Sequence, residues 1–515
     1  MVRQSFIKGT IILLAAGIIN RILGFVPRIV LPRIIGAEGI GLYQMGYPLL
    51  IVILTLINGG IPLAVAKLVA EADAEGNHSK IRLILKVALY ITVSLSICFA
   101  ILCVGYADWI TKHLFTDDRV YYTFLAMSPI ILIGGISSVY RGYFQGLHNM
   151  LPTALSQIAE TAIRIVTVLT FSYMMLPYGV EYAAAGAMAG VVVGEIIGLL
   201  VLLTQFRSDR RRHLLSNKDN SEKLTQFRRL LAVSIPVTAS RLVGSASYFL
   251  ESILIIQSLA IAGVVTAVAT AQYGALQGMV IPILLLPTAL TYSLSVSLIP
   301  SLSEAASKND METVHKRMHQ SLKLSLVTGA PFAVFMFVLA EPLCMLVYNN
   351  AEVGAMLRMM APVAIFIYIQ APLQAALQAL DKPGKALRNT FIGASIKLTL
   401  ISLLASNPSF GILGAIFAIN MNIAIVTILH WVSVTRILKL TMPSIDFFKV
   451  AIAIGISGVI CQSLYSYTLT DYPIARLSVA LLCGLISYFI CCLGLKLIDR
   501  EDLLRVLWLG KKIVK

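Results

Sequence analysis

The stretch GIINRILGFVPRIVLPRIIG, residues 17–36, places three arginines in an otherwise apolar segment long enough to cross a bilayer. They are Arg21, Arg28 and Arg33. An arginine at the bilayer centre costs about 2.5–3.5 kcal/mol on insertion scales, so it normally faces a wet cavity or a partner side chain. This segment therefore indicates a membrane protein that holds positive charge within its spans.

The composition of the whole chain agrees with this interpretation. Of the 515 residues, 58% are hydrophobic and 13% are charged, and apolar runs recur from end to end with short polar breaks. We expect an all-α integral membrane protein with about 14 transmembrane helices and no soluble domain. The spans are predicted at residues 9–35, 42–68, 84–107, 120–146, 153–176, 183–206, 231–258, 273–300, 321–341, 354–379, 387–405, 411–435, 447–468 and 475–496.

The distribution of basic residues predicts the orientation. With both termini in the cytoplasm, 31 of the 41 Lys and Arg residues fall on the cytoplasmic side, as the positive-inside rule requires. Six more lie within spans, and the opposite side has only Arg33, Lys112, Arg119 and Arg476. We therefore expect a multi-pass plasma-membrane protein with both termini cytoplasmic.

Several function classes find no support. The net charge of +16 is spread in short patches at membrane edges, which suits anionic membrane lipids and indicates no nucleic-acid partner. No HExxH, GxSxG or Walker A motif is present, so we expect neither catalysis nor ATP hydrolysis. The seven cysteines lie in apolar runs without metal-ligand spacing, which predicts reduced packing residues and no metal.

The first twelve spans form two similar halves. Residues 127–147 align with residues 360–380, and Arg21-Ile-Leu-Gly24 recurs as Arg241-Leu-Val-Gly244. Because each half has six spans, both halves enter from the cytoplasm, which predicts two parallel six-helix lobes related by a pseudo-twofold axis. The expected domains are an N-lobe at 1–206, a basic cytoplasmic linker at 207–229, a C-lobe at 230–437, and two C-terminal helices with a basic cytoplasmic tail at 438–515.

Two such lobes predict a central cavity that opens alternately to each side of the membrane, as in a transporter. The side chains expected to line it are charged residues within spans, namely Arg21, Arg28, Arg241, Lys397, Glu251 and Glu195. Arg21 and Arg241 occupy corresponding places in the two halves. Because guanidinium groups stay charged and donate paired hydrogen bonds, we expect an anionic ligand such as a phosphate or pyrophosphate.

Some charged residues within the spans have a structural alternative. Glu160 and Arg164 are spaced i to i+4, so they form either a self-sufficient intrahelical ion pair or part of the cavity. Arg28 is equally compatible with an interhelical salt bridge, and the other charged residues are either paired across helices or line the cavity. Prolines in or near the spans are expected to bend their helices, mostly as static bends. They are Pro27, Pro32, Pro62, Pro282, Pro287, Pro331 and Pro362.

Three stretches resemble a known family: INRILGFVPRIVLPRIIGAEGIGLYQMGYP at 19–48, INGGIPLAVAKLVAEADAEGN at 57–77, and RGYFQG at 141–146. They resemble the polysaccharide and lipid-precursor exporters of the multidrug/oligosaccharidyl-lipid/polysaccharide (MOP) superfamily, and within it the sporulation-associated relatives of lipid II flippases. The resemblance covers nearly the whole chain. It implies fourteen helices, a central cationic cavity, and bacterial export of a polyprenyl-pyrophosphate-linked sugar for spore cortex peptidoglycan.

The resemblance also implies partners. The substrate would be a polyprenyl-pyrophosphate-linked glycan, and cell-wall synthases are possible partners. No cofactor is expected, while the membrane potential or a monovalent ion could supply coupling. Arg21 matches the family's first-helix arginine, but the second family arginine falls near Pro27, one position before Arg28. Lipid II flippases hold a further cavity arginine in the second helix, where the region around Ile53 is apolar.

Two other functions remain open at this point. A multidrug cation antiporter of the same superfamily would require buried carboxylates for cations and protons. A non-transporting scaffold for cell-wall synthesis would have no need for arginines within its spans. An enzyme would require a catalytic cluster at a membrane face, and none is apparent.

Overall fold

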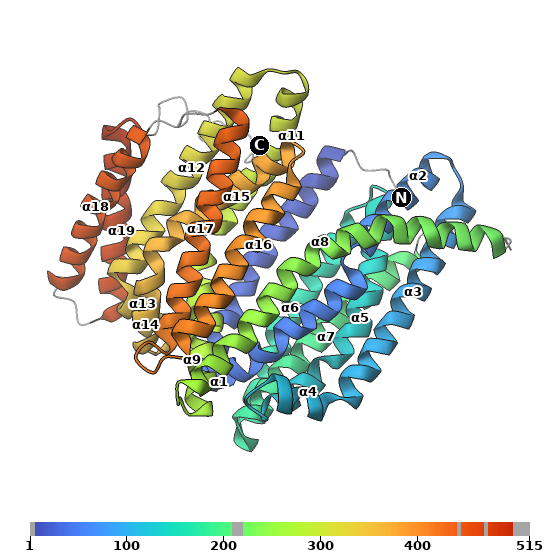
Figure 1. The fold of residues 1–515 in the computed structure, drawn as a ribbon, viewed down its shortest axis with the longest axis horizontal. Helices are drawn as coiled ribbons and strands as arrows, with labels where there is room; N and C mark the ends of the chain where they lie inside the picture. The colour runs from blue at the N-terminus through green and yellow to red at the C-terminus, as the bar shows by residue number, and fades with distance from the viewer. Residues whose placement is uncertain (1–5, 209–219, 440–443, 468–471, 498–515) are drawn as a thin grey trace. The chain divides into compact units, whose positions relative to one another are not determined.

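The computed structural model describes residues 6–208, 220–439, 444–467 and 472–497, and every regular element in these ranges is helical (Figure 1). Residues 209–219 of the predicted linker and 498–515 of the predicted tail lie outside the described residues. Contacts divide the chain into two compact units. Unit 1 comprises Met1–Met279 and Ile401–Ile412, and unit 2 comprises Val280–Leu400 and Leu413–Lys515.

The helices of each unit follow in chain order. Unit 1 contains α1 (Phe6–Asn58), α2 (Ile61–Ala74), α3 (His78–Gly105), α4 (Ala107–Leu114), α5 (Val120–Gly146), α6 (Leu151–Met175), the 3-10 turn η1 (Leu176–Tyr178), α7 (Val180–Arg207), α8 (Asn220–Ile261), α9 (Thr266–Gly274) and the π-helical segments η3 (Ala275–Val280) and η5 (Ile401–Ala405). Unit 2 contains α10 (Ile281–Leu285), α11 (Thr288–Ser307), α12 (Met311–Val338), α13 (Ala340–Tyr348), α14 (Glu352–Met360), the 3-10 turn η4 (Ala361–Val363), α15 (Ala364–Ala379), α16 (Pro383–Leu400), α17 (Ile412–Leu438), α18 (Ser444–Tyr467) and α19 (Pro473–Gly494).

Among the described residues, 13 helical segments are long and apolar enough to cross a membrane. The first, Ala15–Ala74, contains 60 residues, and a continuous helix of that length would measure about 90 Å, three times the hydrocarbon thickness. Gly36 divides it with φ +69° and ψ −179°, a conformation that L side chains rarely adopt. The first segment therefore supplies two predicted spans, and the predicted all-α membrane fold with about 14 transmembrane helices is confirmed.

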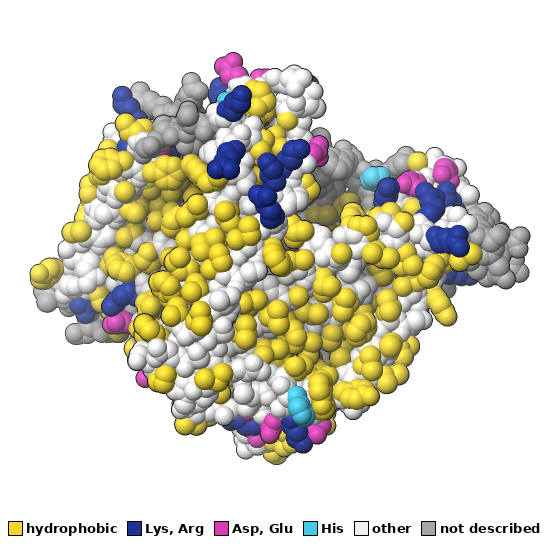
Figure 2. Space-filling model, in the orientation of Figure 1, with side chains coloured by type: hydrophobic (Ala, Val, Ile, Leu, Met, Phe, Trp, Pro, Cys, Tyr) yellow, Lys and Arg dark blue, Asp and Glu magenta, His cyan; other side chains and the backbone are white. Residues whose placement is uncertain are grey.

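The outer surface of the helices is suited to lipid. Large apolar side chains such as Ile101, Tyr173 and Phe391 are exposed. On the face drawn in Figure 2, hydrophobic side chains cover the middle of the helices, while Lys, Arg, Asp and Glu gather towards helix ends. Such a distribution places apolar groups at the level of hydrocarbon and charges at the level of water and lipid headgroups.

The predicted second and eighth spans are each broken by a proline. Pro62 lies in the first turn of α2, immediately after α1 ends, and Pro287 directly precedes α11. A proline lacks the backbone N–H and its ring clashes with the preceding turn, so the start of a helix suits it best. The helix is interrupted between α10 and α11, where Pro287 lies, and Pro282 lies in the first turn of α10. Pro27 and Pro32, by contrast, lie inside α1.

Two helices of the predicted C-lobe belong to unit 1. α8 and α9 both pack against α1, and α8 also packs against α2 and α3. The backbones of α1 and α9 touch, because a Cβ at Gly41 would lie 2.0 Å from the carbonyl oxygen of Thr270, and one at Gly274 would lie 2.1 Å from that of Ala37. The compact units thus divide the chain differently from the predicted lobes, whose pseudo-twofold relation stays a prediction.

A polar cluster holds the loop between α4 and α5 against the place where α1 and α9 meet. The Nε and Nη2 of Arg119 donate hydrogen bonds to Asp117 at 3.0 and 2.8 Å, and its Nη1 donates to Oε1 of Glu38 on α1 at 2.6 Å. Thr270 on α9 donates to Oδ2 of Asp117 at 2.8 Å. Burial alone would raise the pKa of Asp117, but the hydrogen bonds from Arg119 and Thr270 outweigh burial and hold this pKa below its ordinary value.

The two C-terminal helices pack within unit 2. α18 contacts α19 and α12, and the hydroxyl of Tyr488 on α19 donates to the carbonyl oxygen of Val327 on α12 at 2.8 Å. Near the start of α18, Oδ2 of Asp446 lies 3.3 Å from Nε2 of His319 on α12. The helix pair that follows the predicted repeat is therefore held chiefly by α12.

The Asp117 cluster predicts a pH-dependent stability. Asp117→Asn removes the acceptor charge and should lower the free energy of unfolding at neutral pH by about 1.5–3 kcal/mol. Because the pKa of Asp117 is depressed in the folded protein, the stabilisation is present above the ordinary Asp pKa of about 3.9 and is lost as pH falls through the lower folded value.

Thermal unfolding in detergent, at neutral pH and below about pH 4, measures this effect. The difference between wild type and Asp117→Asn should narrow at the lower pH. Asp118→Asn is the matched control, because this neighbouring side chain is exposed. Equal losses of stability in the two variants at neutral pH would contradict the assignment.

Candidate functional site

A glycine face on α7 brings α6 and α7 into backbone contact. Gly186, Gly190, Gly194 and Gly198 recur every four residues and so lie on one side of the helix. A Cβ at Gly190 would lie 2.4 Å from the backbone nitrogen of Val168, and one at Gly194 would lie 2.8 Å from the Cβ of Arg164. Small residues at this spacing allow membrane helices to pack closely.

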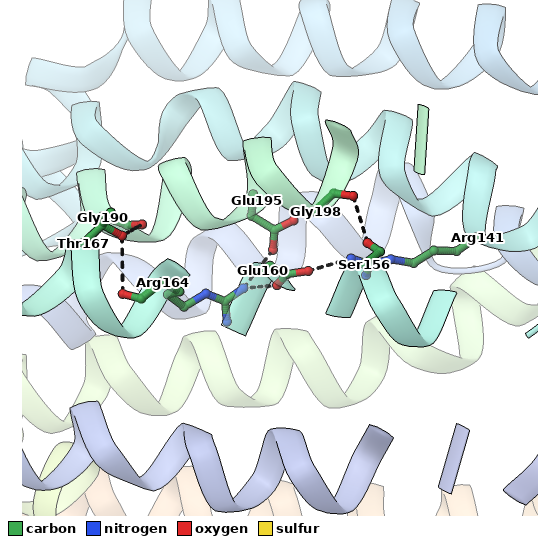
Figure 3. Close-up of polar contacts among 8 residues, drawn as sticks. All are labelled: Arg141, Ser156, Glu160, Arg164, Thr167, Gly190, Glu195 and Gly198. Atoms are coloured by element: carbon green, nitrogen blue, oxygen red, sulfur yellow. Dashed lines mark hydrogen bonds and ion pairs between the residues drawn. The ribbon is translucent and has the colours of Figure 1, made fainter. Parts of the chain in front are cut away.

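Hydroxyl groups of α6 bind the backbone of α7 along the same seam. Thr167 donates to the carbonyl oxygen of Gly190 at 2.8 Å, and Ser156 donates to that of Gly198 at 2.9 Å (Figure 3). Interhelical hydrogen bonds of this kind contribute about 0.6 kcal/mol on average in membrane proteins. The seam therefore fixes the register of α6 against α7.

This register assembles a four-residue ion-pair network (Figure 3). Arg164 on α6 donates through Nη2 to Oε1 of Glu160, one turn earlier, and to Oε1 of Glu195 on α7 at 3.2 Å. Arg141 on α5 donates from the other side to Oε2 of Glu160 at 2.7 Å. The Glu160 side chain is 9% exposed, Glu195 17%, Arg141 24% and Arg164 29%. The expected Glu160–Arg164 pair thus forms, as one part of a larger interhelical network.

The network is balanced in charge but not in hydrogen bonds. Two guanidinium groups face two carboxylates, so the ionised set is neutral. The Nε atoms of Arg141 and Arg164 are nevertheless buried without a hydrogen-bond partner among the described residues. Buried donors normally find an acceptor, so the two arginines retain donor capacity that an anion could use.

Two tyrosines of α1 extend the polar region from this network. Tyr43 lies within electrostatic range of both Arg164 and Arg28, and Tyr47 lies within range of Arg164. Arg28 also interacts electrostatically with Tyr248 of α8. These electrostatic interactions link groups of α1, α6 and α8 inside unit 1, and we call Arg28, Arg164, Tyr43, Tyr47 and Tyr248 the polar centre.

The polar centre borders a further carboxylate. Glu251, one turn after Tyr248 on α8, is 7% exposed and accepts a hydrogen bond from Nε2 of Gln277 at 2.9 Å. Gln277 lies in the π-helical segment η3, where the widened turn displaces the regular side-chain positions. Glu251 is therefore paired across helices, which is one of the two alternatives that its sequence position left open.

The remaining predicted residues have distinct places. Arg21 and Arg241 are exposed side chains of α1 and α8 in unit 1. Arg28 is also exposed, and its guanidinium carbon lies 5.8 Å from the ring centre of Phe25. Lys397 is a buried residue of α16 in unit 2. Unit 1 thus brings Glu160, Arg164 and Glu195 into contact and also contains Arg28, while the predicted ligand-binding role of these residues stays a prediction.

Sequence reasoning missed Arg141, the tyrosines and the glycine face. Arg141 is one of the 31 basic residues that the orientation count assigns to the cytoplasmic side, but it lies in α5 and reaches Glu160. Its position inside the predicted fourth span, at residues 120–146, already indicated that Arg141 lies within a helix of the membrane bundle. The glycines that recur every four residues in α7 are a further signal, because this spacing predicts that the helix that carries them packs tightly on a neighbour. Within the described residues, no group of His, Cys, Asp and Glu could hold a metal ion.

Comparison with known proteins adds the family. The family model described as polysaccharide biosynthesis protein matches residues 6–306, and the MatE model matches residues 244–403. The chain is 40% identical to stage V sporulation protein B of Bacillus subtilis (strain 168) over 520 residues, covering all of both chains. It is 26% identical to lipid II flippase MurJ of the same strain over 77% of each chain.

Solved structures show the same fold. Lipid II flippase MurJ in an inward closed conformation matches with a TM-score of 0.72 at 16% identity, over 93% of this chain and 98% of that chain. An inward-facing multidrug resistance MATE transporter of the MOP superfamily matches with a TM-score of 0.65 at 14% identity, over 81% and 94% of the chains. The resemblance to the MOP superfamily is therefore confirmed.

The glycine face predicts a stability effect. Gly190→Ala should lower the free energy of unfolding by about 1–3 kcal/mol, because the added methyl group meets backbone and the helices must separate. Thermal unfolding in detergent measures the change. Gly455→Ala is the matched control, since a Cβ at Gly455 of α18 meets nothing within 4 Å. Equal melting temperatures for the two variants would show that the α6–α7 contact is not close-packed.

The network predicts an unequal effect of its two carboxylates. Glu160→Gln leaves both arginines without a shared carboxylate and should destabilise the protein by roughly 3–5 kcal/mol. Glu195→Gln should cost less, because Arg164 keeps Glu160. Chemical unfolding of the two variants tests the order, and a larger loss for Glu195→Gln would overturn it.

Proposed function

From the chain's membership of the polysaccharide biosynthesis protein family, whose model matches residues 6–306, we propose that it is a flippase in the bacterial plasma membrane. Its substrate is a polyprenyl-pyrophosphate-linked sugar, which it moves from the cytoplasmic to the outer leaflet. Both termini are cytoplasmic in this proposal.

The observation that carries the proposal is the arginine-rich polar centre within membrane-spanning helices. A pyrophosphate headgroup cannot cross hydrocarbon unaided, because its oxygens would lose water without replacement. Guanidinium groups replace that water with charge-assisted hydrogen bonds. Arg28 and Arg164 both act electrostatically on Tyr43, and Arg21 and Arg241 occupy α1 and α8 of the same unit.

Alternating access supplies the movement in this proposal. Rocking of the two lobes exposes the headgroup first to the cytoplasmic side and then to the outer side, while the polyprenyl tail remains in lipid. The interior-negative membrane potential favours outward movement of an anion by roughly 2.3 kcal/mol per charge per 100 mV. The proposal therefore requires no hydrolysis of ATP and no chemical step on the substrate.

The relatives support a narrower cargo. The chain is 40% identical to a protein named for stage V of sporulation, and 26% identical to a named lipid II flippase. We therefore take the cargo to be a peptidoglycan precursor and the setting to be spore cortex synthesis, in which cell-wall synthases would receive the exported precursor.

A second candidate has its own observation. The MatE model matches residues 244–403, and the MATE transporters share the fold, so export of cationic drugs is the alternative. Glu195 and Glu251 would be the carboxylates available to a cation. Binding measurements with anionic and cationic ligands separate the two functions.

Native mass spectrometry of the purified protein with undecaprenyl pyrophosphate tests the proposal. Wild type should bind this lipid. Arg28→Gln, or the double variant Arg21→Ala/Arg241→Ala, should weaken binding roughly ten- to hundredfold, because each loses charge-assisted hydrogen bonds. Arg33→Gln is the control on the same helix and should bind as wild type does.

The same binding measurement with lipophilic cations tests the antiporter function. Binding of tetraphenylphosphonium in place of the anionic lipid would favour the antiporter. Undiminished lipid binding in the Arg28 and Arg21/Arg241 variants would instead show that these arginines are structural.

A further inference from the structure

Glu195 occupies a position in which it competes with any anion for Arg164. Its carboxylate lies on α7 and accepts from Nη2 of Arg164 at 3.2 Å. The same Nη2 contacts Glu160, which also accepts from Arg141 at 2.7 Å. Glu160 is therefore held by two arginines from two helices, whereas Glu195 is bound to the network through Arg164 at the longer distance.

Among the described residues, the groups that act electrostatically on Glu195 belong to this network. α7 packs against α6, α5 and α1. From α6 come Glu160 and Arg164, and from α5 comes Arg141. α1 contributes Tyr43 and Tyr47 beside Arg164. With both carboxylates ionised, the two arginines are neutralised and exert little net attraction on an anionic headgroup.

Neutralising Glu195 changes this balance. One proton on Glu195 leaves two guanidinium groups facing the single charge of Glu160, and the region gains a net positive charge. Arg164 then has donor capacity to offer, including the buried Nε that lacks a hydrogen-bond partner among the described residues. The same guanidinium lies within electrostatic range of Tyr43, on which Arg28 also acts.

We propose that protonation of Glu195 releases Arg164 to bind the phosphate groups of the substrate, so that binding the anionic headgroup takes up a proton. The proton comes from water, converts the Glu195 carboxylate to a carboxylic acid, and returns to water when the headgroup departs and Glu195 binds Arg164 again. This inference rests on the proposed function, because it requires an anionic substrate at the polar centre.

This coupling predicts that the protein binds the headgroup more tightly when Glu195 is protonated than when it is ionised. If protonation strengthens headgroup binding, the headgroup strengthens proton binding by the same factor. The affinity of wild type for undecaprenyl pyrophosphate should then fall as pH rises, by up to about tenfold per pH unit where Glu195 titrates. Glu195→Gln carries a permanently neutral side chain and should bind the lipid tightly without this dependence.

Isothermal titration calorimetry with undecaprenyl pyrophosphate in detergent tests the proposal. Measurements in two buffers with different ionisation enthalpies give the number of protons taken up. Wild type should take up about one proton more than Glu195→Gln at the same pH. Comparison of the two proteins removes the titration of the lipid phosphates themselves, which is common to both.

Glu195→Asp is the second variant and keeps the test decisive if Glu195→Gln does not fold. Its shorter side chain withdraws the carboxylate from Arg164, so affinity at high pH should rise and proton uptake should fall below that of wild type. Equal proton uptake by wild type and Glu195→Gln, or lower affinity for the lipid in both variants, would overturn the inference. Absence of lipid binding by wild type at every pH would instead overturn the proposed function and this inference with it.

Discussion

A guanidinium group inside a membrane-spanning bundle is stable only where counter-charge or water reaches it, because hydrocarbon offers neither. In unit 1 this requirement governs how α5, α6 and α7 pack. Arg141 and Arg164 share Glu160, and both charges are balanced only because Glu195 approaches from α7. That approach depends in turn on Gly194, where a Cβ would lie 2.8 Å from the Cβ of Arg164. The glycine face of α7 thus allows the four-residue network to form.

The same logic connects local backbone features to the polar centre. Gly36 ends the first membrane crossing of α1, and the crossing that follows carries Tyr43 and Tyr47. The glycine contact between α1 and α9, with Asp117 and Arg119, fixes where this second crossing lies. α1 therefore contributes Arg28 from one side of the break and two tyrosines from the other, and this brings an exposed cation and a partly buried network into electrostatic range.

Much of the fold could be predicted from the sequence, because apolar run length and proline or glycine placement are local properties. The fourteen spans, the break at Gly36 and the interruption at Pro287 are of this kind. Which helices touch is not local. Hydropathy treats Arg141 as an end-of-helix charge, although Glu160 lies within its reach. The repeat predicts how the two halves are related by symmetry. It does not predict that α8 and α9 pack against α1, which depends on close contacts at glycines.

The central claim is that a lipid-linked pyrophosphate occupies the region between Arg28 and Arg164. Photocrosslinking measures this directly: p-benzoylphenylalanine replaces Tyr43, and in a control protein it replaces Tyr90, which is 75% exposed on α3. Radiolabelled undecaprenyl pyrophosphate should crosslink at position 43, and both excess unlabelled lipid and Arg28→Gln should abolish the product. Equal labelling at positions 43 and 90, or labelling at position 43 that survives both competitor and substitution, would contradict the account.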